Sequence, residues 1–407
     1  MKEDKDRKPT QGKEHIIKTV RGFLNSIFDF YKKEKVVRNI FYRGHSNKEF
    51  KLVPSIYRKN DKGDFLYIEN EDKIYRETIA KVPYEFKGKN TIESLVLMQH
   101  YGVPTRILDL TTNPLVALYF ACVGDEKKDG EVIVFDIPQE STCYFDSDKV
   151  TILANLAKCE NDFLYSKDLL PFYEQNIKDL EGKKEEITVL ESISYDNNNS
   201  FFDYVYSKNQ EIQKYLNEQE FDIGNIDNKL NKLISEYEQT RNEKLSDFAK
   251  KELKNNLLRK FITCFNFIID KELEYLNRKY FGKLLHYIRE DKSYFKPIIN
   301  PNHIEQVYAI KPKLDNPRIV RQHGAFLIFG AKETLFYLHN EREIKPIPEI
   351  NPNWIVKGKD KNRIIIKSSH KKDIIDELNR LGINKSTLFP EIDKVADYIK
   401  EKYTAEN

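Results

Sequence analysis

The sequence predicts an α+β protein in which a mixed or antiparallel sheet with flanking helices is interrupted by a helical insertion. Short runs rich in β-branched and aromatic residues occur towards both ends of the chain, at 36–44, 106–110, 131–137, 303–312, 325–330 and 363–369. Between about 150 and 295, Lys and Glu dominate, Gly and Pro are scarce and the periodicity is helical. Strand segments on both sides of a helical block are typical of one domain that carries an insertion.

Four parts of the chain follow from this pattern. Residues 1–13 are polar and charged, and we expect a disordered tail. The sheet-bearing domain is expected over 14–150 and 296–407, and the helical insertion subdomain over 151–295.

The elements of the first part are predicted from periodicity. Residues 14–35 place an apolar stripe on one face and predict an amphipathic helix (Ile16, Val20, Phe23, Leu24, Ile27 and Phe30). A strand ends at Gly44, and helices are expected over 66–84 and 91–100. After a turn at Gly102 and Pro104 come a short strand at 106–110 and a helix opened by Asn113-Pro114.

The insertion and the C-terminal end also show helical patterns. Ile226, Leu230, Leu233, Ile234 and Tyr237 form an apolar stripe, and 261–269 predicts a helix buried on most sides. The last residues predict two helices separated by Gly382 and a turn at Thr387 and Pro390.

Composition excludes several classes of protein. The net charge of +3 implies no global field for nucleic acid or membranes. The four cysteines show no CxxC spacing, which favours reduced thiols in the cytoplasm over a zinc site or disulfides. No apolar run is long enough to span a bilayer, and the N-terminus has no apolar signal region. HExxH, P-loop, GxSxG and GxGxxG motifs are absent, so we expect no metal.

Three segments concentrate polar residues beside apolar ones. In FYRGHS (41–46), Arg43 ends a strand directly before Gly44, where the backbone can turn or a ligand can approach. An Arg there presents a planar fork to a phosphate. The alternative is an Arg tied to a buried carboxylate such as Asp109. The sequence leaves both open.

The second segment, QHYGVPTRILDLTTNP (99–114), places Gln99 and His100 at a helix end and Thr111 and Thr112 before the next helix. Arg106 and Asp109 are expected as half-buried charges that pair with each other, or Asp109 with Arg43. The backbone N–H groups after Thr112 are expected to hold a cap or an anion.

In the third segment, RIVRQHGAFLIFG (318–330), Gln322, His323 and Gly324 precede an apolar strand. A His in this position is either a structural residue or a base. The three segments share polar residues although they lie far apart, so we expect Arg43, residues 105–112 and Gln322 to meet in one site.

Together, FYRG, MQHYGVPTRILDLTTNPLVALYFA and RIVRQHGAFLI resemble the signature blocks of the FRG domain, and TLFPEIDKVADYIK (387–400) is similar to its usual end. The resemblance covers about 35–150 and 295–402. It implies a bacterial or phage-associated protein of antiviral defence.

A more distant similarity is to the Arg–Ser–Glu class of ADP-ribosyltransferases. It implies that Arg43 holds the NAD phosphates and that Thr111 or Thr112 braces the nicotinamide pocket. Gln322 stands where that class has Glu, and a neutral amide cannot offset a ribose cation. Asp109 is the nearest alternative acid. His100 or His323, with a pKa near 6.5, would deprotonate the acceptor.

The leading hypothesis is therefore an ADP-ribosyltransferase-like fold and a transferase that acts on NAD as a toxin or defence effector. Its NAD site would be lined by Arg43, Gly44, Gln99, Arg106, Thr112 and Gly324. The acceptor would be a nucleic acid or a protein, and a cognate antitoxin or defence partner would accompany it. The alternative is a sensor that binds nucleotides or nucleic acid without catalysis. In a third interpretation, the insertion forms a partner or homodimer interface.

Overall fold

The computed structural model describes residues 14–31, 39–160, 281–297, 299–331, 336–338, 341–343, 347–356 and 363–404, with isolated residues between 235 and 279. The chain divides into two compact units. The first comprises Met1–Ser166, Lys283–Phe295 and Ile299–Asn407, and the second comprises Lys167–Gly282 and Lys296–Ile298. The main segment of the second unit, Lys167–Gly282, thus begins later and ends earlier than the predicted insertion. The predicted tail (1–13), the stripe at 226–237 and the apolar run at 261–269 lie outside the described residues.

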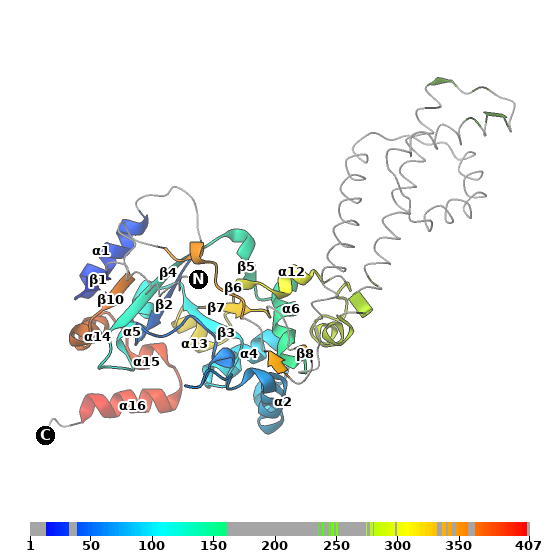
Figure 1. Cartoon of the computed structure of the whole chain (residues 1–407). Helices are drawn as coiled ribbons and strands as arrows, with labels where there is room; N and C mark the ends of the chain where they lie inside the picture. The colour runs from blue at the N-terminus through cyan, green and yellow to red at the C-terminus, as the bar shows by residue number, and fades with distance from the viewer. Residues whose placement is uncertain are drawn as a thin grey trace, which may run out of the picture. The chain divides into compact units, whose positions relative to one another are not determined.

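Among the described residues, eight strands form one sheet in the first unit (Figure 1). Their order across the sheet is β1 (Glu14–Ile17), β10 (Arg363–Ile366), β4 (Gly130–Ile137), β2 (Asn39–His45), β3 (Ile107–Thr111), β7 (Gly324–Phe329), β6 (Val307–Lys311) and β5 (Thr142–Tyr144). β1–β10 and β5–β6 are parallel, and the other neighbours are antiparallel. A separate hairpin pairs β8 (Phe336–Leu338) with β9 (Glu341–Glu343). The predicted α+β class with a mixed sheet is confirmed.

The helices of the first unit flank this sheet. They are α1 (Val20–Tyr31), α2 (Glu71–Lys81), α3 (Pro83–Phe86), α4 (Thr91–His100), α5 (Pro114–Cys122), α6 (Asp148–Asn155), α12 (Pro301–Ile304), α13 (Pro317–Arg321), α14 (Lys371–Arg380), α15 (Lys385–Leu388) and α16 (Ile392–Tyr403). Residues 281–291 form a further helix. Short 3-10 turns include η1 (Ser55–Tyr57) and η4 (Leu156–Lys158).

The predicted helix over 14–35 is wrong at its start. Residues Glu14–Ile17 are strand β1, which pairs in parallel with β10, from Glu14 opposite Arg363 to Ile17 opposite Ile366. Helix α1 begins only at Val20. A four-residue edge strand is too short to show a period of its own, so the helical stripe that follows it masks it in the sequence.

One face of the sheet packs against α1, α5 and α14. Because successive side chains of a strand point to opposite faces, Tyr42 on β2 and Val134 on β4 share this face, and both are buried. Helix α5 lies so close that a Cβ on Gly44 would be 2.0 Å from the carbonyl oxygen of Ala117. Gly44 is therefore required by helix packing.

The opposite face has its own apolar core, which contains Phe41 of β2, Phe135 of β4 and Leu108 and Leu110 of β3. Ile56 and Tyr57 of η1 and residue Trp354 cover it. The alternation of β2 therefore places Arg43 and His45 on this second face, next to Phe41.

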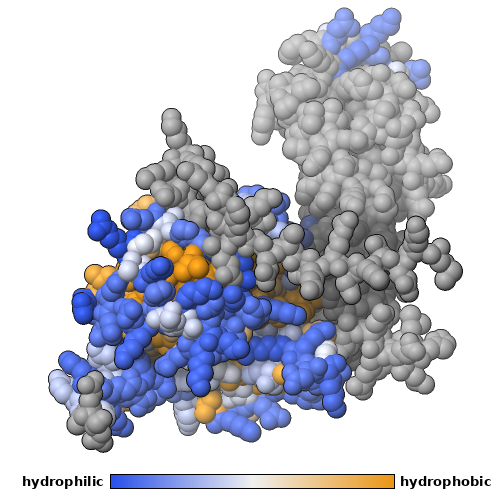
Figure 2. Space-filling model, turned by 60° about the vertical axis from the view of Figure 1, so that its left-hand side comes forward, coloured by the Kyte–Doolittle hydropathy of each residue, from blue (hydrophilic) through white to orange (hydrophobic). Residues whose placement is uncertain are grey.

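The surface of the described residues is mainly hydrophilic in the view of Figure 2, with small hydrophobic patches. No helix in this part of the chain has the length and apolar character needed to cross a membrane. Cys122, Cys143 and Cys159 are free thiols, and burial raises the pKa of Cys122 and Cys159 to about 12. These two thiols are therefore poor nucleophiles at neutral pH.

Candidate functional site

The candidate site lies where the central strands β2 and β3 separate. Their register consists of one residue pair, Tyr42 with Thr111. Beyond it, the guanidinium of Arg43 takes the place of a strand partner, because its Nη1 donates to the carbonyl oxygen of Asp109 at 2.5 Å. Arg43 Nε donates to Nε2 of His45 at 2.9 Å. Two hydrogen bonds thus fix the orientation of the guanidinium.

Asp109 is the unusual residue of β3. The strand is buried at its other four positions, but Asp109 is exposed. Its carboxylate accepts a hydrogen bond from Gln99 Nε2 at 2.8 Å, and Gln99 in turn accepts one from the hydroxyl of Thr105 at 2.6 Å. Asp109 is therefore the one position of β3 that faces solvent.

The expected half-buried Arg106–Asp109 pair is wrong. Arg106 is 3% exposed and forms a bidentate ion pair with Glu71 of α2, through Nε and Nη2. Burial on its own would lower the pKa of Arg106. The neighbouring Glu71 carboxylate favours the charged guanidinium, and the pKa of Arg106 is raised overall. Nη1 of Arg106 also donates to the carbonyl oxygen of Phe329 at 3.0 Å. Arg106 is thus fully engaged inside the protein, which removes it from the predicted NAD-binding residues.

The second and third motifs meet at the end of β3. Thr111 is 4% exposed and its hydroxyl donates to the carbonyl oxygen of Gln322 at 2.7 Å. The backbone N–H of Thr112 donates to the carbonyl oxygen of His323 at 2.9 Å, and Thr111 lies opposite Gly324 in the sheet. These contacts join the motifs through their backbones.

The contacts of Gln322, His323 and Gly324 differ from the ligand-binding or catalytic roles predicted for them. The amide of Gln322 donates to the carbonyl oxygen of Leu388 at 3.1 Å, so this side chain holds the C-terminal segment. His323 is exposed and has a φ of 48°, a turn conformation. A Cβ on Gly324 would lie 3.2 Å from Cγ2 of Ile319, so packing against α13 favours glycine there.

The start of α5 is not open to a phosphate. The N–H of Asn113 donates to the hydroxyl of Thr111 at 3.0 Å, and the N–H of Leu115 donates to the Asn113 side chain at 2.9 Å. Thr112 N–H is held by His323, as described above, and Pro114 has none. The expected pyrophosphate contact at these groups is therefore wrong.

His100 ends α4 beside this region. Its Nδ1 is 3.4 Å from the Asn316 amide, and its carbonyl oxygen accepts from Arg318 Nη1 at 2.9 Å. Burial and the positive charge of Arg318 lower the pKa of His100 to about 4. The expectation of a base with a pKa near 6.5 is wrong, because a group of this pKa accepts a proton only weakly at neutral pH.

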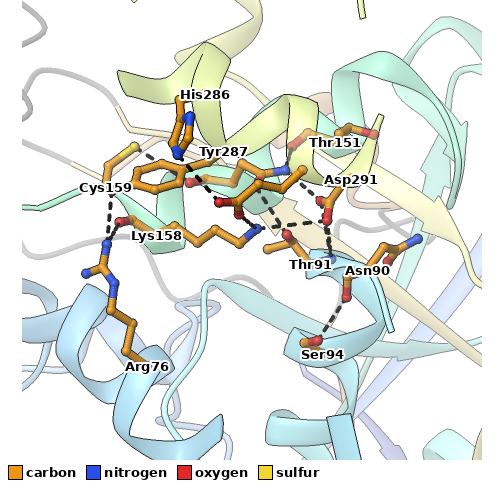
Figure 3. A network of polar contacts seen from close by, with 12 residues as sticks. Arg76, Asn90, Thr91, Ser94, Thr151, Lys158, Cys159, His286, Tyr287 and Asp291 are labelled. Atoms are coloured by element: carbon orange, nitrogen blue, oxygen red, sulfur yellow. Dashed lines mark hydrogen bonds and ion pairs between the residues drawn. The ribbon is translucent and has the colours of Figure 1, made fainter. Parts of the chain in front are cut away.

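The position of α4 is fixed from its other end (Figure 3). The carboxylate of Asp291, on the helix 281–291, accepts from the N–H of Thr91 at 3.2 Å and from the Asn155 amide at 2.8 Å. Arg76 of α2 binds the carbonyl oxygen of Lys158 and the hydroxyl of Tyr287. This network anchors the N-terminal end of α4, whose last two residues are Gln99 and His100.

Sequence reasoning missed two members of the site. Glu71 lies in a charged helix with no motif, so nothing local marks it as the partner of Arg106. His45 follows Arg43 and Gly44 directly, and the alternation of β2 was a usable signal, since it places His45 on the same face as Arg43. The described residues contain no group of three His, Cys, Asp or Glu side chains arranged to hold a metal.

The comparison with known families finds one match. The family model of the FRG domain matches residues 38–130. The resemblance predicted from the first two motifs is confirmed, and the third motif lies outside the matched range. No curated protein and no solved structure matches the chain. The similarity to ADP-ribosyltransferases stays a prediction.

Proposed function

We propose that this FRG-domain protein transfers ADP-ribose from NAD to a macromolecular acceptor, a nucleic acid or a protein. One observation carries the proposal: at the opening between two central strands, the Arg43 guanidinium donates to the backbone carbonyl oxygen of Asp109, whose own carboxylate is exposed. A guanidinium suits a phosphate and a carboxylate suits a developing ribose cation, and NAD contains both groups. The role as a toxin or antiviral effector follows from the family resemblance alone.

The chemistry assigns Asp109 the part that the resemblance gives to Glu. The bond between ribose C1′ and the nicotinamide nitrogen breaks, and its electron pair leaves with nicotinamide. The cation-like ribose is stabilised by the Asp109 carboxylate, which Gln99 orients through its amide. An acceptor oxygen or nitrogen then bonds to C1′ and loses its proton to solvent water. Gln322 takes no part, because its amide is bound to Leu388.

Thr105 and Thr111 hold the residues around Asp109 in position. Thr105 fixes Gln99, and Thr111 ties β3 to Gln322 on the loop before β7. His100 stays neutral above a pH of about 4, since its pKa is lowered to that value. The neutral ring therefore adds no positive charge beside Asp109.

The proposal is tested by incubating the purified chain with NAD and quantifying free nicotinamide. Release above the rate of a heat-denatured sample supports it. Binding of RNA or DNA with strong salt dependence, and no nicotinamide release, would instead favour a sensor that binds nucleic acid without catalysis.

A further inference from the structure

We infer that helix α16 is a dimerisation element, which pairs in antiparallel orientation with α16 of a second copy of this chain. The helix lies at the outer edge of the first unit (Figure 1), and none of its 12 residues is buried. This interface is separate from the candidate site and from the helical insertion, which the sequence offered as a homodimer interface. It does not depend on the proposed transferase activity.

Polar side chains tie α16 to the rest of the first unit. Lys385 Nζ is 2.8 Å from Glu401 Oε1 and 3.8 Å from Asp397 Oδ2. The hydroxyl of Tyr398 donates to Asn379 Oδ1 at 3.1 Å. Asp397, Tyr398 and Glu401 lie at i, i+1 and i+4, so they share one side of the helix. A surface helix normally turns its apolar side inward, and α16 turns this polar side inward instead.

An apolar stripe runs along the opposite side of α16. Its members are spaced at i, i+4, i+7 and i+11: Ile392, Ala396, Ile399 and Tyr403. With 3.6 residues per turn, this spacing keeps all four within an arc of about 60°. Ile392 is 87% exposed, Ile399 49% and Tyr403 75%. Large apolar side chains gathered in one exposed stripe indicate an interaction surface.

The charges beside the stripe favour a second copy as the occupant. Asp393 and Lys400 are seven residues apart, which places them on the same flank of the stripe, near its two ends. In an antiparallel pair related by a two-fold axis, Asp393 of each copy faces Lys400 of the other. A parallel pair would place like charges opposite each other at both positions. Asp393 also pairs with Lys394 of its own helix at 3.0 Å, but an exposed pair of this kind contributes little.

The length of α16 predicts a weak, concentration-dependent dimer. A helix of 12 residues is about 18 Å long, too short to bury by itself the roughly 1,200 Å² of a stable interface. Ala396 lies between Ile392 and Ile399 on the stripe, and its small side chain lets the two helices approach closely. We therefore expect an equilibrium between monomer and dimer.

The test is sedimentation equilibrium of the purified full chain at low ionic strength, over a wide range of protein concentrations. The mass of the wild type should rise with concentration towards that of a dimer. Ile399→Lys should raise the dissociation constant about tenfold or more, because two-fold symmetry places a charge on both sides of the interface centre. The matched control is Leu314→Lys, at a residue between β6 and α13 that is 66% exposed. It should associate like the wild type.

Charge reversal tests the antiparallel orientation. Asp393→Lys should weaken association by about threefold or more, since the substituted side chain then faces Lys400 and the contact occurs twice in a symmetric dimer. Adding Lys400→Asp to the same chain should restore the wild-type dissociation constant. Both positions are exposed, so the Tm of all variants should stay close to that of the wild type.

Three results would overturn the inference. The first is a wild type that keeps the mass of a monomer at every concentration. The second is association that Ile399→Lys leaves unchanged, which would place the interface elsewhere on the chain. The third is a double charge reversal that does not restore association, which would exclude the antiparallel pair.

Discussion

Arg106 is bonded to Glu71 by two hydrogen bonds, and both residues are almost wholly buried, at 3% and 6% exposure. Asp109, three residues further along the chain and inside strand β3, is exposed, and its carboxylate accepts a hydrogen bond from Gln99 instead. One charge of the motif is thus buried and paired, and the other faces solvent. Removing the buried Glu71 carboxylate and removing the exposed Asp109 carboxylate should therefore have different effects.

Glu71→Ala should destabilise the first unit strongly. Removing one partner of a buried ion pair strands the other charge and typically costs about 3 to 5 kcal/mol. Denaturant unfolding of the purified variant measures this loss. Asp109→Asn is the matched comparison and should cost less than about 1 kcal/mol, because an exposed side chain loses only one hydrogen bond. An equal loss of unfolding free energy in the two variants would contradict the view that Glu71 is a buried ion-pair partner and Asp109 is not.

Gln99→Leu should lower kcat about tenfold or more while KM for NAD stays nearly constant. The substitution removes the amide that donates to Asp109 at 2.8 Å, so the carboxylate is no longer held in one orientation. Steady-state kinetics of nicotinamide release give both constants. A rise in KM at constant kcat would mean that Gln99 contributes to substrate binding and does not act through Asp109.

Arg43→Lys should weaken the binding of ADP-ribose about tenfold or more. Lysine keeps the charge but cannot reproduce the fork that bonds His45, Asp109 and a phosphate together. Calorimetric titration gives the affinity and thermal unfolding gives the Tm of the same sample. Unchanged affinity with a lowered Tm would make Arg43 a structural residue only.

His45 should make the protein less stable as the solution is acidified. Burial, together with the positive charges of Arg43 and Arg363, lowers the pKa of His45 to about 3 in the folded state, from 6.5. Between these values the unfolded state binds the proton and the folded state does not. The stabilisation is complete above pH 6.5 and falls by about 1.4 kcal/mol per pH unit below it.

The measurement is the free energy of unfolding between pH 4.5 and 7, for the wild type and His45→Asn. In His45→Asn, the free energy of unfolding should fall less steeply as the pH is lowered, because the contribution of His45 is absent. This holds whatever the overall stability of the variant. An identical slope in both proteins would show that His45 does not titrate differently on folding.

Much of the fold was predictable because periodicity and motif residues are local signals. The pattern of apolar residues predicted β2, β3, β4 and β7, and the shared polar residues predicted contact between β3 and the Gln322–Gly324 segment. The partners of the charges were not predictable. Glu71 reaches Arg106 across 35 residues, and the N–H of Thr112 is taken by a carbonyl 211 residues away. Only tertiary structure decides which acceptor each donor finds.

The most direct test of the central claim is nicotinamide release from NAD by the wild type and by Asp109→Asn. The account predicts release by the wild type and a loss of about a hundredfold or more in the variant, at nearly the same Tm, since the exposed carboxylate stabilises the ribose cation and little else. Release at equal rates by both proteins, or by neither, would contradict it.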